Sequence, residues 1–123
     1  MKTKGNKLKR YLGKKKLLRI YVDNTDLYKG EPLWQKLIEK AKDSGLAGAT
    51  VFKAVAGVGV HTQIHTSSIW SLAQKLPLII EIIDDEDKIM QFLKNNDIMI
   101  GEGLVTLTDV EVLRYKKSSK EPQ

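Results

Sequence analysis

The run LPLIIEII, residues 76–83, decides the fold more than any other part of the sequence. Its proline suits the first position of a strand, and residues 78–83 are apolar at nearly every position. A nearly continuous apolar run is typical of a central strand with both faces buried. We therefore predict an inner strand here, with other strands beside it and helices covering it.

Further strands are predicted on both sides of this run. Residues 18–22 alternate Leu, Ile and Val with Arg and Tyr, which is the two-residue period of a half-buried strand. Residues 50–56 are β-branched and apolar enough to favour a second strand. Strand patterns return at residues 105–107 and again at 110–115.

Two helices are predicted between these strands. The first has Pro32 in its first turn and ends at Gly45. Its apolar residues at helical spacing are Leu33, Trp34, Leu37, Ile38 and Ala41. The second begins at Asp84 and Asp85, whose carboxylates are expected to cap it, and ends at residues 95–96. Its buried face is expected to hold Ile89, Met90, Phe92 and Leu93.

The resulting order is βαββαβ, which predicts an α+β fold with both helices on one face of an antiparallel sheet. A chain of 123 residues has the length for one such domain. We expect the domain to span residues 17–116, between a flexible basic arm at residues 1–16 and a flexible tail at residues 117–123.

The composition excludes several classes of protein. The chain has no cysteine, so disulfides, thiolate metal sites and thiol nucleophiles are excluded. Its N-terminus is charged from Lys2 onward, and its apolar runs are far shorter than the roughly 20 residues of a membrane span. These features fit a cytoplasmic protein.

The net charge of +6 raises the question of a nucleic-acid or membrane partner. Eight Lys and Arg residues, and no acidic one, lie within residues 1–16, whereas the domain between the two ends is nearly balanced in charge. We expect a solvated arm, since terminal charge runs are commonly flexible and no aromatic RNA-binding motif accompanies this one. A nucleic-acid partner is therefore not favoured.

No catalytic constellation is found. His61 and His65 are four residues apart but lack an obvious third ligand, so we expect loop histidines and no metal site. The acidic residues at 84–87 are interpreted as a helix N-terminus. Trp34 is expected in the core, whereas Trp70 is balanced between packing and a contact with another subunit.

Two glycine pairs offer bare backbone amides to an anion. Gly57 and Gly59 follow a predicted strand, and Gly101 and Gly103 precede one. Neither pair matches a Walker loop or a Rossmann fingerprint, and turn glycines remain the alternative.

The order of these motifs resembles the PII family of signal proteins. Residues 45–51, GLAGATV, and 57–59, GVG, resemble the family pattern G-x-x-G-x-T-V followed by G-F-G. Residues 76–82 resemble its L-P-x-x-x-I-E-I, residues 100–103 its I-G-D-G, and residues 114–116 the place of its R-x-R. The sequence is most similar to a PII-like branch that carries the run G-L-A-G-A-T-V and a following I-H-T.

The resemblance covers about residues 17–116 and implies a ferredoxin-like fold, a homotrimer and an adenine nucleotide in each cleft between subunits. It also implies a mobile loop, residues 61–74, that contacts a protein target such as a membrane transporter. The loop residues expected at that target are His61, Gln63, His65, Ser67 and Trp70.

The resemblance also implies roles in nucleotide binding. Thr50 would contact the adenine edge, and Arg114 with Lys116 would face the phosphate charge. The backbone residues expected along the ribose and phosphates are Gly57, Val58, Gly59, Gly101, Glu102 and Gly103. Leu104 replaces the family's phosphate-binding lysine, so ADP or AMP is expected in preference to ATP. No tyrosine lies in residues 61–74, so tyrosyl modification is not carried over, and no cofactor is expected to be required.

The leading hypothesis is thus a regulator, not an enzyme, that binds an adenine nucleotide and reports it to a protein target. Two alternatives remain: an enzyme for a small metabolite in the same cleft, and a basic RNA-associated module.

Overall fold

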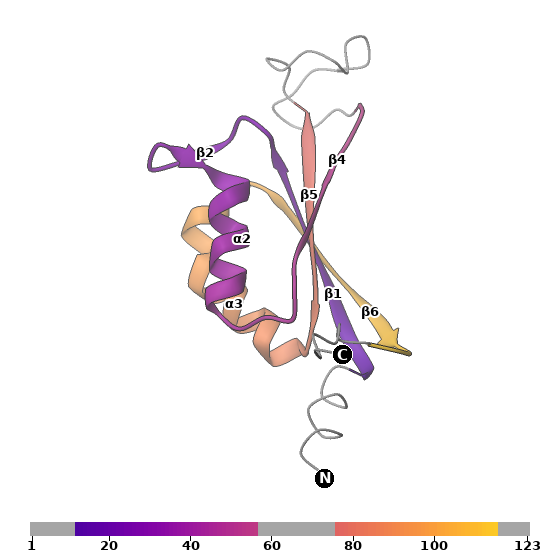
Figure 1. Cartoon of the computed structure of the whole chain (residues 1–123). Coiled ribbons are helices and arrows are strands. Elements are labelled where there is room, and N and C mark those ends of the chain that lie inside the picture. Colours follow the sequence, from indigo (N-terminus) through magenta and orange to yellow (C-terminus); the bar gives the residue numbers. More distant parts are fainter. Residues whose placement is uncertain (1–11, 57–75, 116–123) are drawn as a thin grey trace, which may run out of the picture.

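The computed structural model of the chain describes residues 12–56 and 76–115, which form a four-stranded antiparallel sheet covered by two helices on one face (Figure 1). The elements are β1 (Gly13–Asp23), α2 (Leu33–Asp43), β4 (Thr50–Lys53), β5 (Pro77–Asp84), α3 (Glu86–Ile100) and β6 (Leu104–Val112). The strand order β4-β5-β1-β6 puts β5 and β1 in the centre. The predicted α+β, ferredoxin-like fold and the inner position of residues 78–83 are confirmed.

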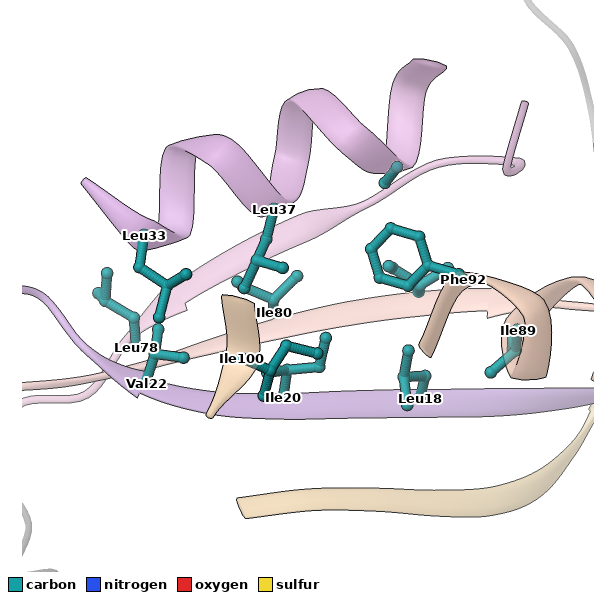
Figure 2. Close-up of a cluster of buried hydrophobic side chains, with 12 residues drawn as sticks. Leu18, Ile20, Val22, Leu33, Leu37, Leu78, Ile80, Ile89, Phe92 and Ile100 are labelled. Carbon is teal, nitrogen blue, oxygen red and sulfur yellow. The ribbon is translucent and has the colours of Figure 1, made fainter. Parts of the chain in front are cut away.

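The core lies between the sheet and the two helices (Figure 2). Leu18 and Ile20 of β1 and Ile80 of β5 are fully buried against Leu37 of α2 and Phe92 of α3. The core residues recur at two-residue spacing in β1 and β5 and at helical spacing in α2, so one face of each of these elements is apolar. Trp34 packs at the margin of this core.

The other face of the sheet is not covered by any element within the described parts of the chain. Residues directly opposite each other in an antiparallel pair point to the same face. Phe52, Ile79, Tyr21 and Leu104 therefore form one row across β4, β5, β1 and β6. The expected burial of β5 on both faces is wrong for a single chain, because Ile79 is only half-buried and Ile83 is exposed. We call this surface the open face.

Helix α3 differs from the prediction at both of its ends. Asp85 occupies the N-cap position, but its carboxylate makes no capping hydrogen bond. The helix does not stop at residues 95–96: Asn96 has non-helical backbone angles that kink it, and it continues to Ile100. The buried side chain of Asn96 donates to the carbonyl oxygen of Phe92 at 2.8 Å. Met90, expected on the buried face, is 48% exposed.

The strand boundaries also move. β1 begins at Gly13, so residues 13–16, assigned to the flexible arm, belong to the sheet. Residues 105–107 and 110–112 lie in one continuous strand, β6, and β4 stops at Lys53 instead of reaching residue 56. A small hairpin, β2 (Leu27–Tyr28) with β3 (Glu31–Pro32), was not predicted. None of the helices in the described residues is long and apolar enough to cross a membrane.

Candidate functional site

An open hollow of about 450 Å³ lies at the end of the sheet where β1 and β4 begin and β6 ends. Its walls come from the connection between α2 and β4, from β1 and β5, and from the residues that follow β6. The lining residues are Lys15, Ala47, Gly48, Ala49, Thr50, Glu81, Ile83, Asp84, Val112, Arg114 and Tyr115. The hollow therefore joins three sequence regions that the resemblance had linked only by motif order.

Asp84 fixes one wall of the hollow. Its buried carboxylate accepts hydrogen bonds from the backbone N–H of Ala47 at 2.8 Å and of Asp85 at 2.7 Å. A buried carboxylate is tolerated when such donors satisfy it. The bond to Ala47 ties the segment before β4 to the end of β5, so the backbone around Gly48 is held against the sheet. Gly48 itself has open space where a side chain would be.

Two further charged pairs border the hollow. The Lys15 ammonium donates to Asp85 Oδ1 at 2.5 Å, and the Lys15 side chain is only 9% exposed. Arg19 Nε donates to Glu81 Oε2 at 2.8 Å across β1 and β5, and this hydrogen bond raises the pKa of the guanidinium. Arg114 adds a second cation to Lys15 in the lining. The lining of the hollow thus holds two cations, Lys15 and Arg114, beside the two carboxylates of Glu81 and Asp84.

The glycine pair before β6 lies at the opposite end of the sheet. Gly101 ends α3 with a φ of 62°, a backbone conformation that residues other than glycine rarely adopt. Gly103 has a different constraint, because a Cβ there would lie 2.8 Å from the carbonyl oxygen of Tyr21. Both glycines are therefore required by the backbone itself, whatever they also bind.

The predicted nucleotide-binding residues consequently fall into two groups. Thr50 and Arg114 meet in the hollow, while Gly101, Glu102 and Gly103 precede β6 at the far end (Figure 1). The nine residues of β6 separate the glycine segment from Arg114, which at 3.3 Å per residue is roughly 30 Å, whereas Thr50 lies level with Thr106, three strands away across the sheet. A mononucleotide is far shorter than about 30 Å, so one chain cannot offer both Arg114 and the glycine segment to the same molecule.

Several expected site residues lie outside the described parts of the chain. They are Gly57, Val58, Gly59, His61, Gln63, His65, Ser67, Trp70 and Lys116. The structure adds Lys15, Glu81 and Asp84 to the hollow, and the sequence interpretation gave none of them a binding role. Glu81 lay within the L-P-x-x-x-I-E-I resemblance, whereas Lys15 was hidden in the basic run.

The acidic residues at the start of α3 are engaged in structural contacts. Asp84 holds the backbone, Asp85 holds Lys15, and Glu86 lies 3.9 Å from the Lys16 ammonium. No group of His, Asp or Glu with the geometry of a metal site occurs among residues 12–56 and 76–115.

Residues 15–112 match the model of the family DUF190, described as "Uncharacterized ACR, COG1993". A UPF0166 protein of Aquifex aeolicus is 45% identical over 102 residues, covering 81% of this chain and 94% of that protein. A UPF0166 protein of Methanocaldococcus jannaschii is 34% identical over 102 residues, covering 82% of this chain and 94% of its own.

The fold is similar to solved structures of PII-like proteins. One is CPII from Thiomonas intermedia K12, bound to ADP and bicarbonate, with a TM-score of 0.61, 19% identity, and coverage of 85% of this chain and 94% of that one. Another is a putative PII-like signaling protein from Thermus thermophilus, with a TM-score of 0.59, 20% identity, and coverage of 83% of this chain and 92% of that one. These similarities establish a PII-like fold.

Proposed function

The chain belongs to the DUF190 family, and from that premise we propose that it is a PII-like regulator that binds an adenine nucleotide between subunits. On this proposal, residues 61–74 report the bound state to a protein target. CPII, which shares the fold, is bound to ADP in one structure and to ADP and AMP in another.

The separation of the two groups of site residues carries this proposal. The hollow with Thr50 and Arg114 is half of a site, and the glycine segment at residues 101–103 is the other half. Two copies of the chain that place opposite sheet ends together would complete it. A ring of three copies repeats this contact three times and closes.

The open face supports assembly independently. Phe52 is 48% exposed and Leu104 is 60% exposed in the same row of side chains, and sheets that expose apolar rows favour burial against a partner. Within residues 12–56 and 76–115, β4 and β6 are the edge strands of the sheet, and a neighbouring chain would cover the backbone groups of such edges. A homotrimer covers both and is the assembly that we propose.

The choice of nucleotide depends on the end of the sheet where β6 begins. Leu104 supplies no charge there for an outer phosphate, and it is exposed. We therefore expect ADP or AMP to bind more tightly than ATP. Leu104→Lys is expected to shift the preference toward ATP.

Calorimetry with AMP, ADP and ATP tests the proposal. A charge-assisted hydrogen bond contributes roughly 1.5–3 kcal/mol, so Arg114→Ala should weaken ADP binding by about one to two powers of ten. Lys42→Ala, which removes an exposed cation from the outer side of α2, is the control and should bind as the wild type does. Absence of adenine-nucleotide binding by the wild-type protein would contradict the proposal.

Complementation tests whether two chains build one site. Arg114→Ala damages the hollow, and Leu104→Glu adds a negative charge at the glycine end, on an edge strand and not in the centre of the row. Each variant alone should keep the trimeric mass in light scattering and should bind ADP weakly. Mixed assemblies, prepared by unfolding and refolding the two variants together, should regain wild-type affinity at some sites, because an undamaged hollow then meets an undamaged glycine end. No recovery in a confirmed mixed assembly would show that the two groups do not share a ligand.

A further inference from the structure

The ion pair between Lys15 and Asp85 lies at the border of the hollow, and both of its members are placed unusually. Lys15 is almost completely buried, with 9% of its side chain exposed, and it lines the hollow beside Thr50 and Arg114. Asp85 is the N-cap residue of α3 and has the extended backbone of such a residue, with φ −67° and ψ 146°. Its carboxylate nevertheless bonds Lys15 and makes no capping bond to the helix.

The two carboxylates that line the hollow, those of Glu81 and Asp84, are held by other donors. Glu81 accepts from Arg19, and Asp84 accepts from two backbone N–H groups. Asp85, by contrast, has an alternative set of partners within reach of a rotation of its side chain: the N–H groups of the first turn of α3, which an N-cap aspartate ordinarily bonds. Lys15 also has an alternative partner whenever an anion enters the hollow.

We propose that Lys15 binds the phosphate of a nucleotide in the hollow, and that it exchanges Asp85 for this phosphate so that Asp85 caps α3 when the ligand is bound. The proposal rests on the proposed nucleotide site and adds to it a binding residue and a conformational link. Both side chains keep a partner in both states, because Lys15 gains the phosphate oxygens as Asp85 gains the helix N–H groups. Ligand binding would thereby be transmitted from the hollow to the start of α3.

Matched lysine variants separate this role from general charge. Lys15→Met keeps the aliphatic stem and should weaken AMP and ADP binding by about tenfold, since one charge-assisted hydrogen bond is lost while the competing pair with Asp85 no longer has to be broken. Binding of adenosine, which has no phosphate, should be unchanged. Lys16→Met removes the next lysine of β1, which pairs with Asp109 outside the hollow, and should leave all three affinities unchanged.

Asp85 variants test the exchange itself. Asp85→Asn removes the charge that competes for Lys15 but retains a good N-cap residue, so AMP and ADP should bind about two- to fivefold more tightly, as expected for losing a partly exposed ion pair. In the wild type, ADP should slow the hydrogen exchange of the Asp87 and Lys88 backbone amides, which are the donors that an N-cap carboxylate bonds. Asp85→Ala should abolish that slowing.

The outcomes distinguish this inference from the proposed function. If Lys15→Met binds ADP as the wild type does while Arg114→Ala binds it weakly, the role of Lys15 is wrong and the nucleotide site stands. Equal losses for adenosine and ADP would mean that Lys15 only supports the hollow, which also overturns the inference. If the wild type binds no adenine nucleotide, both proposals fall.

Discussion

The two faces of the sheet are built from alternate residues of the same strands but differ in what covers them. On the helix-covered face, Leu18, Ile20 and Ile80 are fully buried within one chain. On the open face, Phe52 and Leu104 remain exposed, and the Arg19–Glu81 pair lies in the row next to theirs. The first face is therefore complete in a single chain and fixes its fold, whereas the second is available to fix its assembly.

The largest expected effect tests the helix-covered face. Phe92→Ala removes a fully buried ring (Figure 2) and should lower the free energy of unfolding by about 3–5 kcal/mol. The matched change on the open face, Phe52→Ala, should cost at most about 1 kcal/mol, since half of that ring is already exposed. Denaturant unfolding at protein concentrations low enough to separate the subunits measures both.

If Phe92→Ala and Phe52→Ala lowered the free energy of unfolding equally, the difference between the two faces would be contradicted. Such a result would mean that the open face is as completely buried as the core in the separated chain.

The two faces were also not equally predictable from sequence. The core face follows from local pattern: Leu18, Ile20 and Val22 alternate, and Leu33 and Leu37 recur at helical spacing. The open face does not follow from local pattern. The apolar run at residues 78–83 predicts a central strand, but it does not show whether the second face of that strand is covered by the chain itself or by another copy.

The hollow was predictable only in part. Thr50 and Arg114 were singled out by resemblance, and the structure brings them together. Lys15 was missed because residues 14–16 are all lysine and show no apolar alternation, while its partner Asp85 is 70 residues away in the sequence. A local sequence pattern cannot predict a pairing over that distance.

The end of α3 was predicted too early. Sequence reasoning placed the end of the helix at residues 95–96, but tertiary contacts around Ile100 let the helix continue past the kink at Asn96.

The next prediction concerns assembly through the open face. Ile79 lies between Phe52 and Tyr21 in the row across the sheet, so Ile79→Lys should prevent subunits from associating while leaving the fold intact. In a separated chain the long lysine side chain can reach solvent. Light scattering should show the mass of one chain for this variant and a larger, trimeric mass for the wild type.

A control on the helical side sharpens that result. Ile98 of α3 is 85% exposed, and Ile98→Lys should leave the mass unchanged. Dissociation by the Ile98 variant would assign the subunit contact to the helices, and assembly of the Ile79 variant would show that the open face is not the contact.

The smallest expected effect concerns the ion pair at the edge where β1 meets β6. The hydrogen bond between Lys16 and Asp109 raises the pKa of the ammonium and lowers the pKa of the carboxyl.

A carboxyl whose pKa is lower in the folded state stabilises the fold above its unfolded pKa and loses that contribution as the pH falls through the folded value. The lysine contributes in the opposite range and loses its part as the pH rises through its own raised pKa. Wild type should therefore be slightly more stable than Lys16→Met at neutral pH. The difference should disappear in acid as the pH falls through the lowered pKa of Asp109, and in alkali as it rises through the raised pKa of Lys16. Because the pair is exposed, added salt should also reduce the difference. Thermal unfolding of both proteins across pH, at low and high salt, measures the difference. Because methionine keeps an aliphatic stem, a difference that persisted in acid would show that the ion pair with Asp109 is not its cause.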